Sequence, residues 1–240
     1  MHEILDIIKI EDITRMEKES LEFCKESLYK EDYDTEWIDF NELVEIVSSS
    51  VISGDKYLNE DIFHTQHGLR HHLRVQIYSY ILMKKLNYNE DSIRLMNYIC
   101  SIHDTQRKND YKDHEHGLLA YKKFIENSNL FSNDTKETLK EVLETHDSKI
   151  EETDNLLLMI LKCADALDRF RLKNLKGWIN FDRIPKSSLE ELMKIRNETK
   201  KIVMLCRNFT LMTERYRIEN EDDNDYDVIM RNIYLLKREK

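Results

Sequence analysis

Histidine and aspartate side chains are concentrated in residues 64–104. This stretch contains five of the nine histidines of the chain and ends in the doublet His103-Asp104. The histidines that precede the doublet are His64, His67, His71 and His72. Burying imidazole and carboxylate groups is costly unless a metal, a proton-transfer step or a partner charge uses them. The stretch therefore predicts the first half of a metal-centred hydrolytic site, with the second half further along the chain.

The remaining candidate ligands lie downstream of the doublet. Asp165 lies inside the most apolar segment of the chain, and His116 and His146 lie near the ends of two other apolar segments. An unpaired ionisable group is destabilising in such surroundings. The predicted metal ligands are therefore His71, His103, Asp104 and Asp165, with His116 and His146 as additions.

These residue types favour a divalent cation and phosphoryl chemistry. Imidazole and carboxylate together suit Mn²⁺, Fe²⁺, Zn²⁺ or Ni²⁺, or a mixed pair that includes Mg²⁺. Asp104, which follows a ligand histidine, can bridge two metals. Two ions about 3.5–4 Å apart would activate water and stabilise both oxygens of an in-line phosphoryl displacement. The opposing interpretation is a group of buried polar residues that satisfy one another.

The elements that position these residues are predicted to be helices. Four glycines and one proline in 240 residues are too few for a fold with many turns. Apolar residues recur at helical spacing in nearly every segment. The pattern predicts one all-α domain over residues 1–240, with a core at about 60–175 and helical additions at 1–59 and 176–240.

Helix boundaries follow from capping residues and breaks. We expect caps at Asp34 or Thr35, at Asn133 or Asp134, and at Asp154, and a further long helix from Ser187 or Ser188. A helix over about 66–85 places His67, His71 and Arg74 on one stripe. The next helix ends at the doublet, and residues 105–115 form a polar loop. An acidic loop at 219–227 precedes a short last helix.

Charge and composition exclude several classes of protein. The net charge of −10 argues against a general nucleic-acid or anionic-membrane surface. The longest apolar run stops at Lys162, which is too short for a membrane span. The N-terminus lacks the basic region of a secretion signal. Four widely spaced cysteines are expected to be reduced and mostly buried, and the expected location is the cytoplasm.

Five segments between His67 and Arg171 resemble the HD-domain metal-dependent phosphohydrolase superfamily. They are HGLRHHLRV, IHDTQR, HG, ETHD and CADALDRFR, in the order of the family pattern H…HD…H…H…D. The resemblance covers nearly half of the chain and implies an all-helical core. It implies that His71, His103, Asp104 and Asp165 bind metal. His116 and His146 would complete a second metal site or face the substrate.

HGLRHHLRV also resembles the cyclic-nucleotide phosphodiesterase signature HNxxHxxDV. This resemblance implies that His67 protonates the leaving oxygen while His71 binds metal, an arrangement that i, i+4 spacing allows. Arg74 stands where those enzymes have aspartate, and Thr105-Gln106 replaces the Ile-Gly of many HD proteins.

Basic residues near the motifs are candidates for holding phosphate oxygens, because guanidinium groups match phosphate geometry. They are Arg74, Arg107, Lys108, Arg169 and Arg171. Arg74 and Arg169 have an alternative role as structural ion-pair partners, for example of Asp165 or Asp168 in the case of Arg169. His64, His72 and His114 are expected to be exposed.

The sequence thus predicts a phosphohydrolase acting on a phosphodiester or nucleotide-type substrate. A macromolecular substrate is an open possibility, since phosphodiesterase domains of bacterial effectors that cleave phosphoribosyl links to proteins look similar. A second hypothesis is an HD-fold di-iron oxygenase. A third is a non-catalytic nucleotide-binding or regulatory module.

Overall fold

The computed structural model describes residues 38–149, 153–169, six positions between 202 and 213, and 224–236. Every regular element within these ranges is a helix, which confirms the predicted all-α fold. Predictions for residues 1–37 and for most of 170–223 lie outside the described residues. None of the described helices combines the length and the apolar character needed to cross a membrane.

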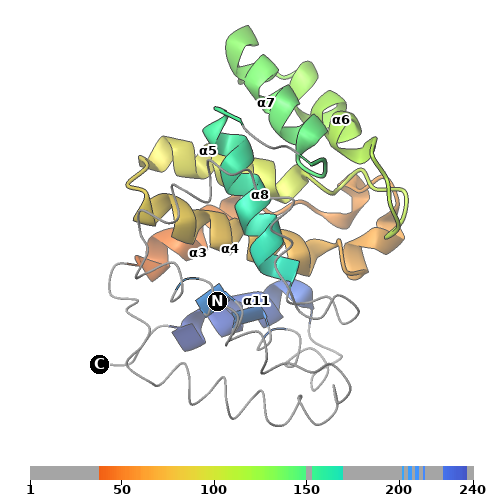
Figure 1. Ribbon diagram of the computed structural model, residues 1–240. Coiled ribbons are helices and arrows are strands. Elements are labelled where there is room, and N and C mark those ends of the chain that lie inside the picture. Colours follow the sequence, from red (N-terminus) through yellow and green to blue (C-terminus); the bar gives the residue numbers. More distant parts are fainter. Residues whose placement is uncertain are drawn as a thin grey trace.

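Helix α4 (Leu69–Lys85) lies at the centre of the described structure (Figure 1). All of its residues from Leu69 to Met83 are buried, so it is surrounded on every side. It packs against α5 (Glu90–Ile102), α8 (Leu156–Asp168), α3 (Phe40–Ser49) and α11 (Asp225–Leu236). Because α5 and α8 both contact α4, residues distant in sequence meet beside it.

The remaining described elements lie around this centre. Two short 3₁₀ helices, η2 (Gly54–Lys56) and η3 (Glu60–His64), lead into α4. Helix α6 (His116–Tyr121) continues as one π-helical turn, η4 (Lys122–Glu126). The α6–η4 segment packs against α7 (Asn133–Thr145), and α7 also packs against α8 (Figure 1).

The capping residues of α7 and α8 differ from the prediction by one or two residues. Ser132 caps α7, because its side chain accepts a hydrogen bond from the Thr135 backbone N–H, and Asn155 caps α8 in the same way. The predictions of Asn133 or Asp134, and of Asp154, were wrong by one or two positions, since neighbouring Ser, Asn and Asp residues cap equally well. Helix α3 is capped by Asp39. The predicted Asp34 and Thr35 lie outside the described residues.

Serine side chains end α3, and α11 begins earlier than expected. Helix α3 ends at Ser49, where the Ser49 and Ser50 hydroxyls donate to the Ile46 carbonyl. These side-chain bonds compete with the helical backbone pattern. Helix α11 begins at Asp225, inside the predicted acidic loop, and buries Val228, Ile229 and Ile233.

The break between α4 and α5 is where the sequence placed it. Asn87 has a φ of +59°, a left-handed conformation that asparagine tolerates, and the Asn89 side chain caps α5. The described cysteines, Cys100, Cys163 and Cys206, are free and buried, as predicted. Burial raises the pKa of the Cys100 thiol to about 12, so it stays protonated at neutral pH.

Candidate metal centre

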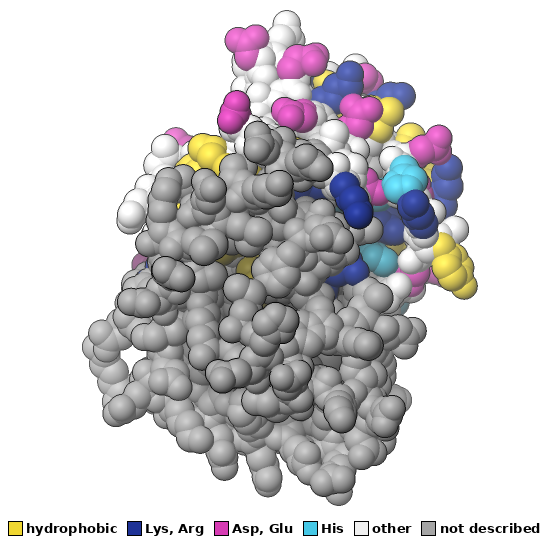
Figure 2. All heavy atoms as spheres, viewed as in Figure 1, with side chains coloured by type: hydrophobic (Ala, Val, Ile, Leu, Met, Phe, Trp, Pro, Cys, Tyr) yellow, Lys and Arg dark blue, Asp and Glu magenta, His cyan; other side chains and the backbone are white. Residues whose placement is uncertain are grey.

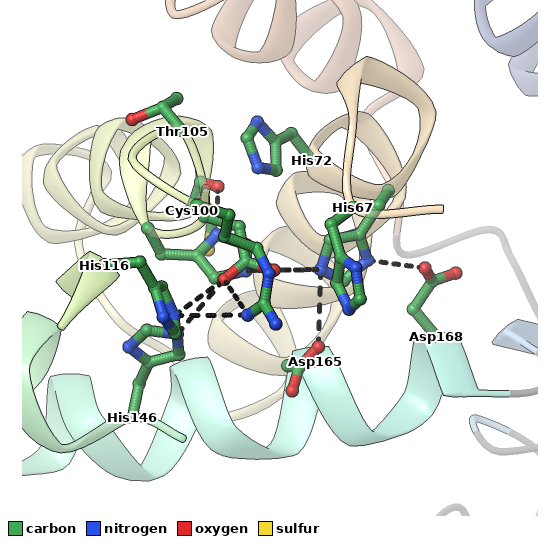
Figure 3. Close-up of polar contacts among 12 residues, drawn as sticks. His67, His72, Cys100, Thr105, His116, His146, Asp165 and Asp168 are labelled. Carbon is green, nitrogen blue, oxygen red and sulfur yellow. Dashed lines mark hydrogen bonds and ion pairs between the residues drawn. The ribbon is translucent and has the colours of Figure 1, made fainter. Parts of the chain in front are cut away.

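Side chains from helices α4 to α7 and their ends converge at one buried point (Figure 3). Helix α4 supplies His71, His103 and Asp104 directly follow α5, α6 begins with His116, and His146 is the C-cap of α7. Each of these five residues is at most 5 % exposed. The sequence-predicted ligands of α4 to α7 therefore lie together.

Each of the four imidazoles is held by its Nδ1 atom, which lies 2.6–2.7 Å from an acceptor. The acceptors are the Asp168 carboxylate for His71, and the Cys100, Asp113 and Leu143 carbonyls for His103, His116 and His146 respectively. Backbone carbonyls cannot donate, and a buried carboxylate accepts when ionised, so each Nδ1 carries the hydrogen. In the neutral rings, each Nε2 therefore presents a lone pair.

The Nε2 atoms meet in two pairs. The His71 and His103 Nε2 atoms are 3.2 Å apart, and those of His116 and His146 are 3.1 Å apart. Two lone pairs repel at this distance unless a proton or a metal ion lies between them. Fixing Nδ1 and turning Nε2 inward is how proteins orient histidine ligands.

The Asp104 carboxylate lies between the two pairs. Its Oδ2 is 3.7 and 3.8 Å from the Nε2 atoms of His71 and His103. Its Oδ1 is 3.0 and 3.5 Å from those of His116 and His146. We call the group around Oδ2 subsite A and the group around Oδ1 subsite B. Both have the nitrogen and oxygen donors of a divalent transition-metal site, and each triad is close enough to share an ion.

Asp165 adds a second carboxylate to subsite A. It projects from α8, and its Oδ1 lies 3.4 Å from the His71 Nε2 (Figure 3). Its side chain is 22 % exposed, so it lies on the more open side of the site. All six sequence-predicted ligands therefore belong to one constellation.

Burial and neighbouring charges shift the pKa values of the site residues in opposite directions. Burial lowers the pKa of His103 to about 4, so this imidazole is neutral at neutral pH. Burial alone would raise the pKa of Asp104, but the electrostatic effect of the neighbouring His103 and Arg107 side chains and hydrogen bonds from His116 and His146 lower it well below its usual value. Burial also disfavours the charged form of His116, but Asp104 outweighs it and raises the His116 pKa.

His67, the predicted proton donor, lies one residue before the N-cap of α4. Its Nδ1 is 2.8 Å from Asp110 Oδ1, and the Thr65 hydroxyl donates to the same oxygen at 2.9 Å. Its ring lies edge-to-face against that of His71, with centroids 5.9 Å apart. Burial opposes ionisation of Asp110, but the hydrogen bonds from His67 and Thr65 outweigh it and lower the Asp110 pKa.

Asp110 was missed in the sequence. It lies in the polar loop at 105–115, which has several acidic residues at no diagnostic spacing. Lys162 was also missed as a supporting residue. Its Nζ donates to the His146 and Ser148 carbonyls at 2.7 and 2.6 Å, which fixes the chain where α7 ends. A lysine in the most apolar helix was the available signal.

The predicted phosphate-binding residues separate in the structure. Arg74 lies behind His71, is 1 % exposed, and donates through Nε and Nη2 to Asp168 at 2.5 and 3.3 Å. This geometry favours the structural alternative for Arg74. Arg107 lies at subsite B, 3.3 Å from Asp104. Lys108 is exposed beside the site and pairs with Glu115.

The last two basic candidates are Arg169 and Arg171. Arg169 is the half-buried C-cap of α8, four residues after Asp165. Arg171 lies outside the described residues.

His72 corrects an expectation of exposure. It is 1 % exposed, its Nδ1 lies 2.7 Å from the Tyr57 hydroxyl, and its ring stacks on that of Tyr57. The physical reason is that α4 is buried all round, which leaves no solvent side at this position. His64 and His114 are exposed, as predicted.

Comparison with protein-family models, with curated proteins and with solved structures finds no match.

Proposed function

We propose that the chain is a divalent-metal-dependent phosphohydrolase of the HD-domain type, acting on a phosphodiester or nucleotide-like ester. The observation that carries the proposal is Asp104, whose two oxygens face two inward-turned histidine pairs. A carboxylate between two sets of inward-turned imidazoles is arranged as a metal ligand. The ordered sequence motifs support the same assignment.

The donor set fits a divalent metal ion. His71, His103, Asp104 and Asp165 would hold an ion at subsite A, and His116, His146 and Asp104 are the donors of subsite B. Divalent cations bound there would supply Lewis-acid chemistry, lowering the pKa of a water and stabilising charge on phosphate oxygens.

His67 and Asp110 form the proton-transfer pair of the proposed reaction. Asp110 accepts the Nδ1 hydrogen of His67, which leaves Nε2 as the atom that transfers a proton to the leaving oxygen. The carboxylate also stabilises the imidazolium that must form before that transfer. His67 is only partly buried, so a substrate arriving from solvent can reach it.

Local positive charge suits an anionic substrate despite the net charge of −10. On the face shown in Figure 2, histidine side chains are visible among lysine and arginine side chains at the edge where Figure 1 shows the loop between α5 and α6. Arg107 and Lys108 belong to this loop and are the proposed phosphate contacts.

The test compares Asp104→Ala with Asp91→Ala, which removes an exposed carboxylate from the first turn of α5. Metal content is measured after purification, and hydrolysis of bis(p-nitrophenyl) phosphate and a nucleotide panel is measured with Mn²⁺, Ni²⁺ or Mg²⁺. We expect Asp104→Ala to lose metal and to lower the rate by at least about a hundredfold, since a ligand matters more than its supporting residues. Asp91→Ala should match wild type. Equal metal content and rates in all three proteins would refute the proposal.

The same purification separates the alternative functions. A di-iron oxygenase would contain iron after anaerobic purification and would consume O₂ with candidate polyols or phosphonates. A regulatory module would bind a nucleotide without turnover.

A further inference from the structure

We propose that the Arg107 guanidinium takes the place of a cation at subsite B, so that the protein holds one divalent ion, at subsite A. The second positive charge next to the phosphate is then supplied by Arg107. This inference rests on the proposed function in one respect, which is that subsite A binds a metal ion.

Arg107 contacts the same atoms that define subsite B. Its Nη1 lies 3.3 Å from Asp104 Oδ1 and 3.4 Å from the His116 Nε2. The His116 Nδ1 donates to the Asp113 carbonyl, so the neutral ring offers a lone pair at Nε2. A guanidinium N–H and a metal ion would therefore compete for these two acceptors.

The loop holds Arg107 in this position. Its backbone N–H bonds the Asp104 carbonyl, which closes a turn directly after the doublet. Its Nη2 donates to the Tyr111 carbonyl at 2.8 Å, and the residue is 8 % exposed. The guanidinium is thus anchored from both sides of the loop.

Subsite A is more negatively charged than subsite B. Subsite A receives the Asp165 carboxylate in addition to one oxygen of Asp104. Subsite B receives the other oxygen of Asp104, which already faces the guanidinium. A divalent ion at subsite B would lie next to this positive charge and to the ion at subsite A, and like charges repel strongly in a water-poor site. Subsite A is therefore the one that fills.

The Nε–H of Arg107 indicates that this site binds a phosphate group. Its Nε is buried and has no hydrogen-bond partner in the part of the chain that the structure describes. A buried donor without an acceptor is costly. A phosphate oxygen would satisfy it through a charge-assisted hydrogen bond, which is the bond that guanidinium groups form best.

The experiment counts ions in the full-length protein. Chelator-treated wild type, Arg107→Met and the control Lys108→Met are titrated with Mn²⁺ by calorimetry, and the bound ions are examined by electron paramagnetic resonance. Lys108→Met removes the same charge from the same loop, but from an exposed pair with Glu115. We expect one tight Mn²⁺ with a mononuclear spectrum in wild type and in Lys108→Met.

In Arg107→Met we expect a second Mn²⁺ and a spin-coupled spectrum. Its affinity should rise on the order of tenfold to a hundredfold over any second binding in wild type, because a like charge is removed from the site. Arg107→Gln is a second variant, which is neutral and retains an N–H for the Tyr111 carbonyl. Thermal unfolding verifies that each variant folds.

Three outcomes would overturn the inference. Two ions of similar affinity in wild type would show that Arg107 does not occupy subsite B. A single ion in wild type and in both folded Arg107 variants would show that something other than Arg107 keeps subsite B closed. Absence of bound Mn²⁺ in every protein would overturn the proposed function itself, together with this inference.

Discussion

Two polar networks flank the candidate metal centre, and they use arginine differently. The inner network lies behind His71 and consists of Arg74, Asp168, Thr210 and Thr213. The loop network lies at the polar loop and consists of Thr65, His67, Arg107 and Asp110. Arg74 pairs with Asp168, which is not one of the proposed metal ligands, whereas Arg107 pairs with Asp104, which is.

The two networks differ in their exposure to solvent and in whether their polar atoms could also contact a metal ion or a phosphate. Arg74 and Asp168 are 1 % and 0 % exposed, and Asp168 accepts from His71, Arg74 and Thr210. Their charges satisfy each other and orient one ligand, which is a structural task. His67 and Asp110 are partly exposed, and Arg107 faces atoms that a metal or phosphate could also use. The inner network should therefore govern stability, and the loop network should govern chemistry.

The largest expected effect is on stability, from Arg74→Met. Removing the guanidinium leaves the Asp168 carboxylate buried without its partner, which should lower the free energy of unfolding by about 3–5 kcal/mol. Urea denaturation measures the loss. Adding Asp168→Asn should recover part of it, because the uncompensated charge is then gone.

Arg107→Met is the comparison for this test. Its carboxylate partner Asp104 keeps the hydrogen bonds from His116 and His146, which still favour the ionised carboxylate, so the loss should be clearly smaller. A loss as large as that of Arg74→Met would erase the distinction between the two networks.

A second effect concerns pH and the ligand His103. Its pKa is about 4 in the folded protein and near 6.5 when unfolded. Between these values the unfolded chain binds a proton that the folded chain does not, so stability is complete above pH 6.5 and decreases as pH falls toward 4. The decrease should be about 3 kcal/mol in metal-free protein.

Urea denaturation with chelator at several pH values measures this decrease. His103→Asn should flatten the dependence between pH 6.5 and 4. His114→Asn, which changes an exposed histidine of the loop, should keep the wild-type slope. Equal slopes in all three proteins would contradict the assignment to His103.

The sequence predicted what depends on local order. Apolar spacing placed α4 and α5, and the doublet lies at the end of α5 as expected, because a helix boundary is fixed by nearby residues. Each of the six ligand candidates was identified from a motif of its own, and the structure brings all six together. Caps were missed by one or two residues where equivalent capping residues stand side by side.

The sequence could not predict what depends on how helices pack. Arg74 and Asp168 are 94 residues apart, and the partner of Arg74 is decided by the contact between α4 and α8. The burial of His72 follows from helices that surround α4 on all sides. Asp110 meets His67 only because the polar loop folds back over the start of α4. None of these pairings leaves a periodic signal.

A third effect is on catalysis, from Asp110→Asn in the loop network. The amide cannot stabilise a protonated His67, so turnover should fall roughly tenfold to a hundredfold at little change in KM. The loss should be smaller for p-nitrophenyl esters than for esters of alkyl alcohols, because p-nitrophenolate leaves without being protonated. Steady-state kinetics with both substrates measures this difference.

His114→Asn is the control for Asp110→Asn. His114 and Asp147 form a second histidine–aspartate pair, with Nδ1 and Oδ2 3.0 Å apart, in which the His114 side chain is 61 % exposed. Its removal should leave both rates unchanged. An equal loss on both kinds of substrate after Asp110→Asn would mean that Asp110 supports the loop and not proton transfer.

The smallest effects come from one threonine in each network. The Thr213 hydroxyl accepts from Arg74 Nη1 and donates to the Thr210 carbonyl. Thr213→Val should lower the free energy of unfolding by about 1 kcal/mol and leave turnover unchanged, since one buried hydrogen bond is lost. Thr65→Val removes the hydroxyl that donates to Asp110, and it should lower turnover a few-fold while the unfolding midpoint stays close to wild type. Urea denaturation and steady-state kinetics of both variants test whether the two networks have different tasks. If Thr213→Val impaired turnover and Thr65→Val lowered only stability, the tasks assigned to the two networks would be reversed.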